Sequence, residues 1–474
     1  GWLDEFSAWI GELNRKNACL EWWAYTSTAK NLLSSRLGMK VLEARAVVQL
    51  ATRPDAGTLQ VVGATYGQKK AILRLLSNAS GTDIGFKERF RTWLSRLWVS
   101  FRLVAQSARV WSGFFRVNRP TPETSPDLCF VTYLDAPPSQ GGDAYFGDVR
   151  ERLKEIRPGI TSVMVPYIYA PYRRRIRQLR LVSGEKPLSL FGFLRLSDHF
   201  WAIAISLRET FASGFDLTSN DPHGNALIPI AQEAMLDDLS TGGYLHNLLA
   251  YRAVRRMIRA LGPQCIVYPY ENKSLEKALI LAVRAENEAS GPGGAARLVG
   301  YQHTSVTPRH RTLLFEPGEA AITPLPDSIV TVGDVTRRWL ELRGRYPEGM
   351  FRTGCALRQR WPAALRSRSG WREAPRILLA LSSSRTELIR AVAFLSEVAR
   401  YQSEIEIGVR PHPNFPISLL PDALQRWIVG HARDLSGTSL GENLEWCDVV
   451  AYVSSTVALE GLMAGRPLIK LANY

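Results

Sequence analysis

The segment that decides the fold spans residues 446–470 and reads WCDVVAYVSSTVALEGLMAGRPLIK. An apolar run at 448–453 predicts a buried strand, and Ser454, Ser455 and Thr456 follow where that strand should end. A helical segment comes next, and a Gly-Arg-Pro turn then leads into another strand. A strand that enters a hydroxyl-rich helix start presents free backbone N–H groups and the positive end of the helix dipole to an anion. The segment therefore predicts a strand–helix–strand unit with a phosphate or nucleotide site.

The same alternation of strands and helices extends back along most of the chain. A first series begins with LCFVTYLDAP at 128–137, and a second series begins near residue 325 with PDSIVTVGDVTRRWLELRG. Alternating strands and helices favour parallel sheets with right-handed crossovers, in which ligands bind beyond the carboxyl ends of the strands. We therefore expect an α/β fold with two Rossmann-like domains, 126–324 and 325–474, that face each other across a cleft.

Residues 1–125 form a mostly helical N-terminal region in this interpretation, with a possible strand pair near 40–62. Three prolines at 120–126 indicate a linker after it. Between 86 and 119 there are eight basic residues and one acidic residue, interleaved with Trp and Phe. Aromatic and basic residues at helical spacing favour a helix that lies on an anionic membrane surface. The alternative is a helix packed on the next domain, with its arginines in water.

The composition limits the classes of function. Lys and Arg number 59 against 44 Asp and Glu, and this net charge of +15 favours an anionic partner: nucleic acid, anionic lipid or a phosphorylated substrate. A second basic cluster, 173–180, adds to this charge. The five cysteines are scattered, which fits a reducing cytoplasm and disfavours disulfides and structural zinc. No apolar run reaches the ~18 residues that a membrane span requires.

The second series carries the residues expected to bind a nucleotide. The corner VRPHPNF places Arg410 and His412 at a strand end, and Pro413 helps to fix the direction of the imidazole. A second hydroxyl loop contains Ser383 and Ser384. Either hydroxyl loop alone is explained by helix capping, and a lone histidine in a corner is often structural. Together, at one edge of one sheet, they favour a nucleotide site.

Carboxylates complete the set of candidate residues. Glu460, one turn inside the last helix, is a candidate to accept from ribose hydroxyls or to interact with the helix dipole. Glu271, in YPYENKSLEKA, is the candidate general base or nucleophile, with a surface helix start as the alternative. Asp135 is a rival carboxylate in the first corner, and Asp143 and Asp148 follow it. His303, in GYQHTSVTP, ends the next strand and is a candidate substrate contact or a buried structural histidine.

The order of these motifs resembles that of GT-B glycosyltransferases, and most of all bacterial transferases that use CMP-activated ulosonic acids such as sialic acid or Kdo. Their HP motif and downstream hydroxyl motif, which hold CMP, match His412-Pro413 and Ser454-Ser455-Thr456, and Glu460 matches an acid that contacts the ribose. DAYFGDVRERL, YPYENKSLEKA and GYQHT also look like segments of bacterial surface-carbohydrate biosynthesis proteins. The resemblance covers about 128–474. The acidic motif that supplies the base in sialyltransferases is matched only approximately, by Glu271-Asn272.

The resemblance implies a glycosyltransferase that needs no metal or cofactor and moves a ulosonic acid from CMP to a lipid-linked glycan of the capsule, O-antigen or lipopolysaccharide. It also implies an acceptor and catalytic role for 126–324, a donor role for 325–474, and a cytoplasmic enzyme peripheral to the inner membrane. Rival readings are a UDP-GlcNAc 2-epimerase, whose glycine-rich serine motif and GTRPE segment are missing, and a CDP-glycerol-type polymer transferase. A basic nucleic-acid-binding protein leaves the HP and SST corners unexplained, so we expect no nucleic-acid partner. The chain lacks Walker A, GxGxxG, GxSxG and HExxH motifs, which disfavours the corresponding enzyme classes.

Overall fold

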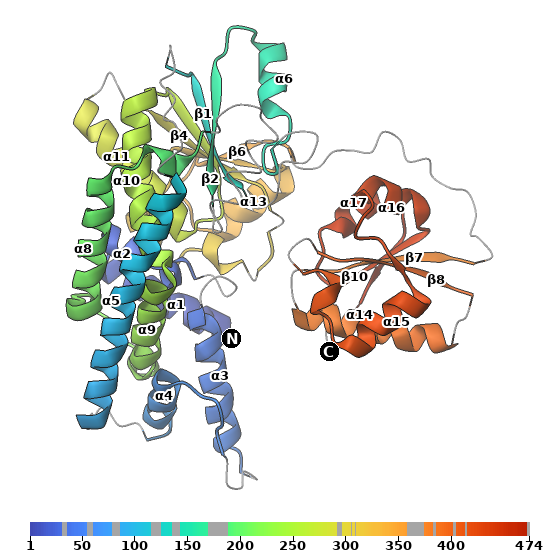
Figure 1. Cartoon of the computed structure of the whole chain (residues 1–474), viewed down its shortest axis with the longest axis horizontal. Helices are drawn as coiled ribbons and strands as arrows, with labels where there is room; N and C mark the ends of the chain where they lie inside the picture. Colours follow the sequence, from blue (N-terminus) through green and yellow to red (C-terminus); the bar gives the residue numbers. More distant parts are fainter. Residues whose placement is uncertain are drawn as a thin grey trace. The chain divides into compact units, whose positions relative to one another are not determined.

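The computed structural model describes residues 1–30, 36–54, 60–77, 86–114, 125–134, 143–168, 188–291, 296–304, 306–308, 310–357, 374–382, 385–401, 404–412 and 415–471. The chain divides into two compact units, Gly1–Arg358 (unit 1) and Gln359–Tyr474 (unit 2). Each unit is built around one parallel β-sheet (Figure 1). The expected α/β class with two parallel sheets and a helical N-terminal region is therefore confirmed.

Unit 1 contains a six-stranded sheet in the order β2-β1-β3-β4-β5-β6, and every adjacent pair is parallel. Its strands are β1 (Leu128–Leu134), β2 (Ser162–Ile168), β3 (Cys265–Pro269), β4 (Arg297–Gln302), β5 (Ser328–Thr331) and β6 (Phe351–Thr353). Alternate side chains of β1 point to opposite faces, as the period of a strand requires. Cys129 and Val131 join the main core, which also contains residues of α10 (Gly243–Leu261) and α11 (Ser274–Ser290), whereas Phe130 packs with Phe146 beside α6 (Val149–Ile156).

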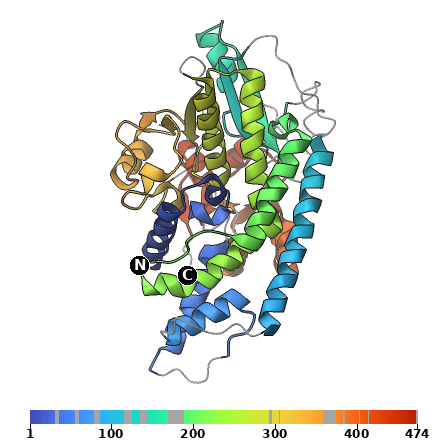
Figure 2. The ribbon, with the colours of Figure 1, turned by 90° about the vertical axis from the view of Figure 1, so that its left-hand side faces the viewer.

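The remaining helices of unit 1 lie mostly before the sheet in sequence or between β2 and β3. They are α1 (Trp2–Lys16), α2 (Leu20–Trp23), α3 (Arg36–Ala51), α4 (Tyr66–Ser77), α5 (Phe86–Phe114), α8 (Leu196–Ala212), α9 (Pro222–Thr241), α12 (Glu319–Ile322) and α13 (Asp334–Arg343). Short 3₁₀ turns occur at Thr26–Ala29, Leu190–Phe193 and Arg311–Leu313. Figure 2 shows the long helices α5, α8 and α9 in unit 1. The N-terminal helices share the main hydrophobic core of unit 1, so they are part of that unit rather than a separate domain.

Two expectations from the sequence differ from the structure. Residues 40–51 form part of a helix, α3, rather than a strand, because Leu37, Val41 and Ala44 recur at helical spacing and are buried in the main core of unit 1. The boundary between the two α/β units falls after Arg358 rather than near 325. The reason is that β5 pairs with β4 and β6 pairs with β5, so both strands extend the first sheet.

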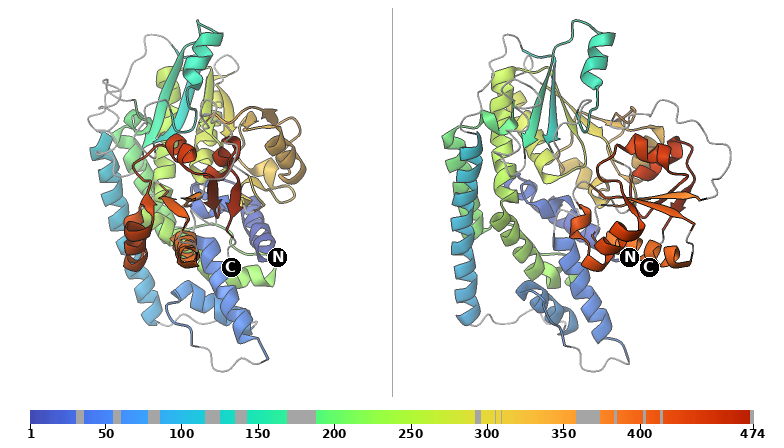
Figure 3. Two further views of the ribbon diagram at one scale, coloured as in Figure 1. Left: turned by 90° about the vertical axis from the view of Figure 1, so that its right-hand side faces the viewer. Right: turned by 45° about the vertical axis from the view of Figure 1, so that its right-hand side comes forward.

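Unit 2 contains a five-stranded parallel sheet in the order β11-β10-β7-β8-β9. Its strands are β7 (Arg376–Ala380), β8 (Glu406–Arg410), β9 (Arg433–Asp434), β10 (Val449–Tyr452) and β11 (Leu468–Lys470). Its helices are α14 (Arg385–Tyr401), α15 (Asp422–His431), α16 (Leu440–Trp446) and α17 (Val457–Met463), with a 3₁₀ turn at Ile417–Leu419. One core lies between the sheet and α14 and α15, and a second core lies on the face that carries α16 (Figure 3). The predicted strand–helix–strand unit at 446–470 is present as β10, α17 and β11.

Candidate functional sites

In unit 2 the two hydroxyl loops meet at the carboxyl edge of the sheet. Ser382 follows β7 and Ser454 follows the adjacent strand β10. Both hydroxyls donate to the same oxygen, Oε2 of Glu387, which lies in the first turn of α14; the Ser382 Oγ–Glu387 distance is 2.7 Å. The sequence predicted that the loops share an edge but missed Glu387. The available signal was an acidic residue in the first helical turn after a serine loop.

Arg410, the last residue of β8, adds a cation at the same edge, because β8 is the other neighbour of β7. Arg410 Nη1 donates to the carbonyl oxygen of Thr438 at 2.9 Å and to Oδ1 of Asn443 at 2.6 Å. Both acceptors are neutral, and no ion pair joins Arg410 to a carboxylate within the described ranges. Burial lowers the pKa of the Arg410 guanidinium. The side chain is thus held in place by neutral acceptors, and a role for its charge in ligand binding stays a prediction.

His412 lies in the tight turn that follows Arg410. Its carbonyl oxygen accepts from the backbone N–H of Phe415 at 2.9 Å, and the two residues form an antiparallel bridge. The residue is half-buried. His412 follows β8 and so lies at the same edge of the sheet as the ends of β7 and β10, and its role in ligand binding stays a prediction. Pro413, Ser383 and Ser384 lie outside the described residues.

The last loop of the site shows no side-chain capping of its helix. Thr456 is the N-cap residue of α17, yet its side chain makes no capping hydrogen bond, and it is exposed together with Ser454. Ser455 is half-buried, and Glu460 is half-buried within α17. The capping alternative therefore does not explain the hydroxyls of Ser454 and Thr456. Roles in ligand binding for Ser455, Thr456 and Glu460 stay predictions.

In unit 1 the structure pairs two of the predicted catalytic residues. Glu271 follows β3 and His303 follows the adjacent strand β4, and Nε2 of His303 lies 3.3 Å from Oε1 of Glu271. The other oxygen of Glu271 forms an ion pair with Lys273. The Glu271 side chain is 20% exposed and that of His303 only 3%, so Glu271 is the more accessible of the pair. The rings of His303 and Tyr145 pack nearly perpendicular to each other, at a centroid distance of 4.8 Å.

The ionisation of Glu271 reflects opposing influences. Burial raises its pKa, but the hydrogen bond from His303 and the positive charge of Lys273 outweigh burial, and the pKa falls to about 2. Glu271 is therefore a carboxylate throughout the physiological pH range. A carboxylate with so low a pKa stabilises positive charge well but is a weak proton acceptor.

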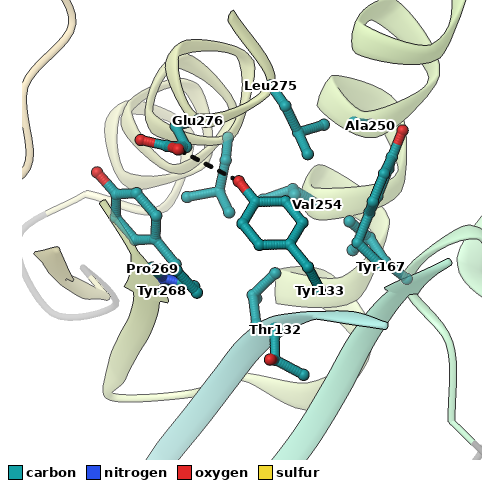
Figure 4. Close-up of a pocket in the computed structure, with 12 residues that line it drawn as sticks. Thr132, Tyr133, Tyr167, Ala250, Val254, Tyr268, Pro269, Leu275 and Glu276 are labelled. Carbon is teal, nitrogen blue, oxygen red and sulfur yellow. Dashed lines mark hydrogen bonds between the residues drawn. The ribbon is translucent and has the colours of Figure 1, made fainter. Parts of the chain in front are cut away.

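A second, buried carboxyl group, that of Glu276, holds the Glu271 loop through hydrogen bonds to its backbone. Glu276 Oε2 accepts the backbone N–H groups of Glu271 and Asn272 at 2.8 and 2.7 Å, and the Tyr133 hydroxyl donates to Oε1 at 3.3 Å (Figure 4). Asn272 has φ +58°, and its side chain donates to the carbonyl oxygen of Thr312 at 2.6 Å. Burial, together with the negative charge of Glu271, raises the pKa of Glu276 to about 8. Nothing in the sequence pattern indicated this role of Glu276.

A small cavity of about 10 Å³ adjoins this support, and Tyr133, Tyr167 and Glu276 are among the residues that line it (Figure 4). Its volume corresponds to about one water molecule, so it is a packing void rather than a substrate pocket.

Of the rival carboxylates of the first corner, Asp143 and Asp148 have other partners in the structure, and Asp135 stays a candidate. Asp135 lies outside the described residues. Asp143 accepts from the hydroxyl of Thr132 and from the backbone N–H groups of Tyr145 and Phe146, so its oxygens hold the turn that positions the Tyr145 ring. Asp148 forms a surface ion pair with Arg152.

No group of three or more His, Cys, Asp or Glu side chains in the described ranges has the geometry to hold a metal ion. Within the same ranges, none of the helices combines the length and apolar character needed to cross a membrane.

No protein-family model and no curated protein matches the chain. Among solved structures, it is similar to UDP-GlcNAc 2-epimerase from Neisseria meningitidis bound to UDP-GlcNAc, with 10% identity and a TM-score of 0.43 over 73% of this chain and 83% of that chain. It is also similar to the glycosyltransferase SnogD from Streptomyces nogalater, with 15% identity and a TM-score of 0.36 over 73% and 82% of the two chains. Because both TM-scores lie below 0.5, these similarities do not by themselves assign a fold family or an activity.

Proposed function

We propose that the chain is a GT-B glycosyltransferase whose unit 2 binds the nucleotide of an activated sugar. The observation that carries the proposal is the group at the carboxyl edge of the second sheet: Glu387 ties together two hydroxyl loops, and Arg410 lies at the end of the next strand without a carboxylate partner among the described residues. Hydroxyls and a fixed cation at such an edge are suited to a phosphate group.

The expected donor is a CMP-activated ulosonic acid, and the expected acceptor is a lipid-linked surface glycan. Both rest on the order of the HP and SST motifs in the sequence. In the proposed reaction the bond between the sugar's anomeric carbon and the phosphate oxygen breaks, and the phosphate leaves with the electron pair. Arg410 and the hydroxyl of Thr456 stabilise the charge that develops on this leaving group.

Glu271 contacts the acceptor in this proposal, and His303 holds the carboxylate in position. With a pKa of about 2, Glu271 is fully ionised at neutral pH. Its charge stabilises an oxocarbenium-like transition state, and it accepts the acceptor's proton late, after the new glycosidic bond has made that hydroxyl acidic. Glu276 acts as a positioning residue because it fixes the backbone of the Glu271 loop.

Nucleotide binding is the first test. Thermal unfolding is measured with CMP, CDP, UMP and UDP, and we expect CMP to raise the unfolding temperature most. Replacing Glu387 by Ala releases both hydroxyl loops and should weaken CMP binding by about tenfold, the loss of about 1.4 kcal/mol. Glu397→Ala, a change at an exposed site of the same helix, is the matched control. Failure of all four nucleotides to bind overturns the proposal. Selective binding of UDP would show that UDP, and not CMP, is the nucleotide of the donor, and it would favour the epimerase alternative.

Catalysis is tested separately from binding. Glu271→Gln keeps the size of the side chain and removes its charge, so CMP binding should persist while sugar transfer falls by about 100-fold or more. Near-normal turnover of this variant would rule out the role assigned to Glu271. A strongly salt-dependent affinity for nucleic acid without nucleotide binding would instead support the basic nucleic-acid-binding alternative.

A further inference from the structure

Helix α5 exposes a row of large apolar side chains. Leu94, Leu97, Trp98, Phe101 and Val104 are all exposed, and Trp98 and Phe101 reach 58% and 67%. Their spacing places them along one side of the helix. A soluble surface helix normally turns its polar side outward, so this exposed row is unusual.

The opposite side of α5 already has a packing partner. Val99, Leu103 and Val110 are buried in the core of unit 1. Oγ of Ser107 lies 2.9 Å from Nδ1 of His199 in α8, and Nε2 of Gln106 donates to the carbonyl oxygen of Ser240 at 2.8 Å. The buried side therefore accounts for the packing of α5 against the rest of unit 1, and this packing does not require the exposed row.

Helix α8 lies along α5 and also exposes large apolar side chains (Figures 1 and 2). Its exposed large side chains are Leu196, Phe200 and Phe211, at a spacing that again follows one side of a helix. Two neighbouring helices therefore both expose large apolar side chains, which include aromatic rings of the kind that settle at membrane interfaces.

The charge around the exposed row identifies its occupant. The sequence of α5 contains six basic residues and a single acidic residue, Glu88. Arg102 and Arg109 are exposed, and the guanidinium of Arg102 lies 6.0 Å from the centroid of the Trp98 ring. Long basic side chains beside an apolar row can reach phosphate headgroups while the aromatic rings enter the acyl boundary.

We infer that the α5–α8 surface docks on an anionic lipid bilayer, with α5 lying parallel to the membrane plane. At 1.5 Å per residue, its 29 residues span about 43 Å of that plane. The binding energy combines burial of the apolar row with attraction between the arginines and the headgroups. The inference is independent of the proposed nucleotide site, because it concerns unit 1 alone and is tested without nucleotide.

The test is sedimentation of the full chain with vesicles. We expect the protein to bind vesicles of phosphatidylcholine with about 30% phosphatidylglycerol. Its affinity for vesicles of phosphatidylcholine alone should be weaker by about tenfold or more. The double change Trp98→Ala and Phe101→Ala should weaken binding to the anionic vesicles by about tenfold or more. Phe394→Ala, which removes a ring that is 53% exposed on α14, is the matched control and should bind as the unchanged protein does.

A second variant separates charge from apolar burial. Arg102→Glu with Arg109→Glu should abolish the preference for anionic vesicles, and its unfolding temperature shows whether the fold is kept. Equal binding to neutral and anionic vesicles, or full binding by the Trp98/Phe101 variant, overturns the inference. A third outcome also overturns it: the original protein binds no vesicles and forms a stable dimer in light scattering, and the Trp98/Phe101 change dissociates that dimer. The surface would then serve self-association.

Discussion

Replacing Glu276 by Gln tests the buried support of the Glu271 loop. The amide oxygen of Gln can accept both backbone N–H groups that Glu276 Oε2 accepts, and its NH₂ group can donate to the Tyr133 hydroxyl. The change therefore keeps the three contacts and removes only the ability to ionise. Any difference in the pH dependence of stability then reports the titration of Glu276.

The size of the effect follows from the pKa values. The pKa of Glu276 is about 8 in the folded protein against an ordinary value of 4.5, so the folded state retains a proton that the unfolded chain releases. The stability that this proton provides is complete below pH 4.5 and is lost as the pH rises to 8. Between pH 5 and pH 7 the loss amounts to about 2.5 kcal/mol, at 1.36 kcal/mol per pH unit. The Gln variant should lack this loss.

The assay is urea unfolding of the full chain followed by circular dichroism at pH 5, 6 and 7. We expect the variant's free energy of unfolding, relative to that of the original protein, to rise by about 2.5 kcal/mol across this range. Glu397→Gln, at an exposed ion pair on α14, controls for a general effect of removing a carboxylate. Parallel pH profiles for the Glu276→Gln variant and the original protein would refute the reasoning, because Glu276 would then be ionised in both states.

Two further changes test other buried features. Lys277 is buried, its Nζ lies 4.3 Å from the centroid of the Trp23 ring, and burial lowers its pKa to about 7. Between pH 7 and 10.5 the unfolded chain therefore binds a proton that the folded protein lacks. Lys277→Met should stabilise the protein more at pH 7 than at pH 10, and the gain should shrink by about 1.4 kcal/mol per pH unit. Equal gains in thermal unfolding at both pH values would contradict this. In β8, an added Cβ at Gly408 would lie 2.6 Å from side-chain atoms of Leu435 and of Trp446. Gly408→Ala should therefore destabilise unit 2 by about 1–3 kcal/mol in urea unfolding, and a neutral result would show that these side chains move aside.

Several elements were predictable from the sequence because their signals are local. The 446–470 segment alternates strand, hydroxyl loop, helix and turn, and the structure contains β10, α17 and β11 at those places. The 29-residue helix α5 was predictable from its spacing of aromatic and basic residues. The boundary between the units was not, because a strand such as β5 has the same local pattern in either sheet, and only its hydrogen bonds to β4 assign it to unit 1.

The candidate sites divide in the same way. The sequence by itself determined that strand ends carry candidate site residues, and in a parallel sheet strand ends share an edge. Arg410 ends its strand, and Glu271, His303, His412 and Ser454 follow theirs. Only the tertiary structure decided which of these side chains meet. The pairing of Glu271 with His303, the junction of Ser382 and Ser454 at Glu387, and the buried Glu276 depend on strand order and burial. Strand order and burial are not encoded in the spacing of residues along the chain. Strand order brings together residues from separate elements, and the pKa of a buried carboxyl group depends on its surroundings in space.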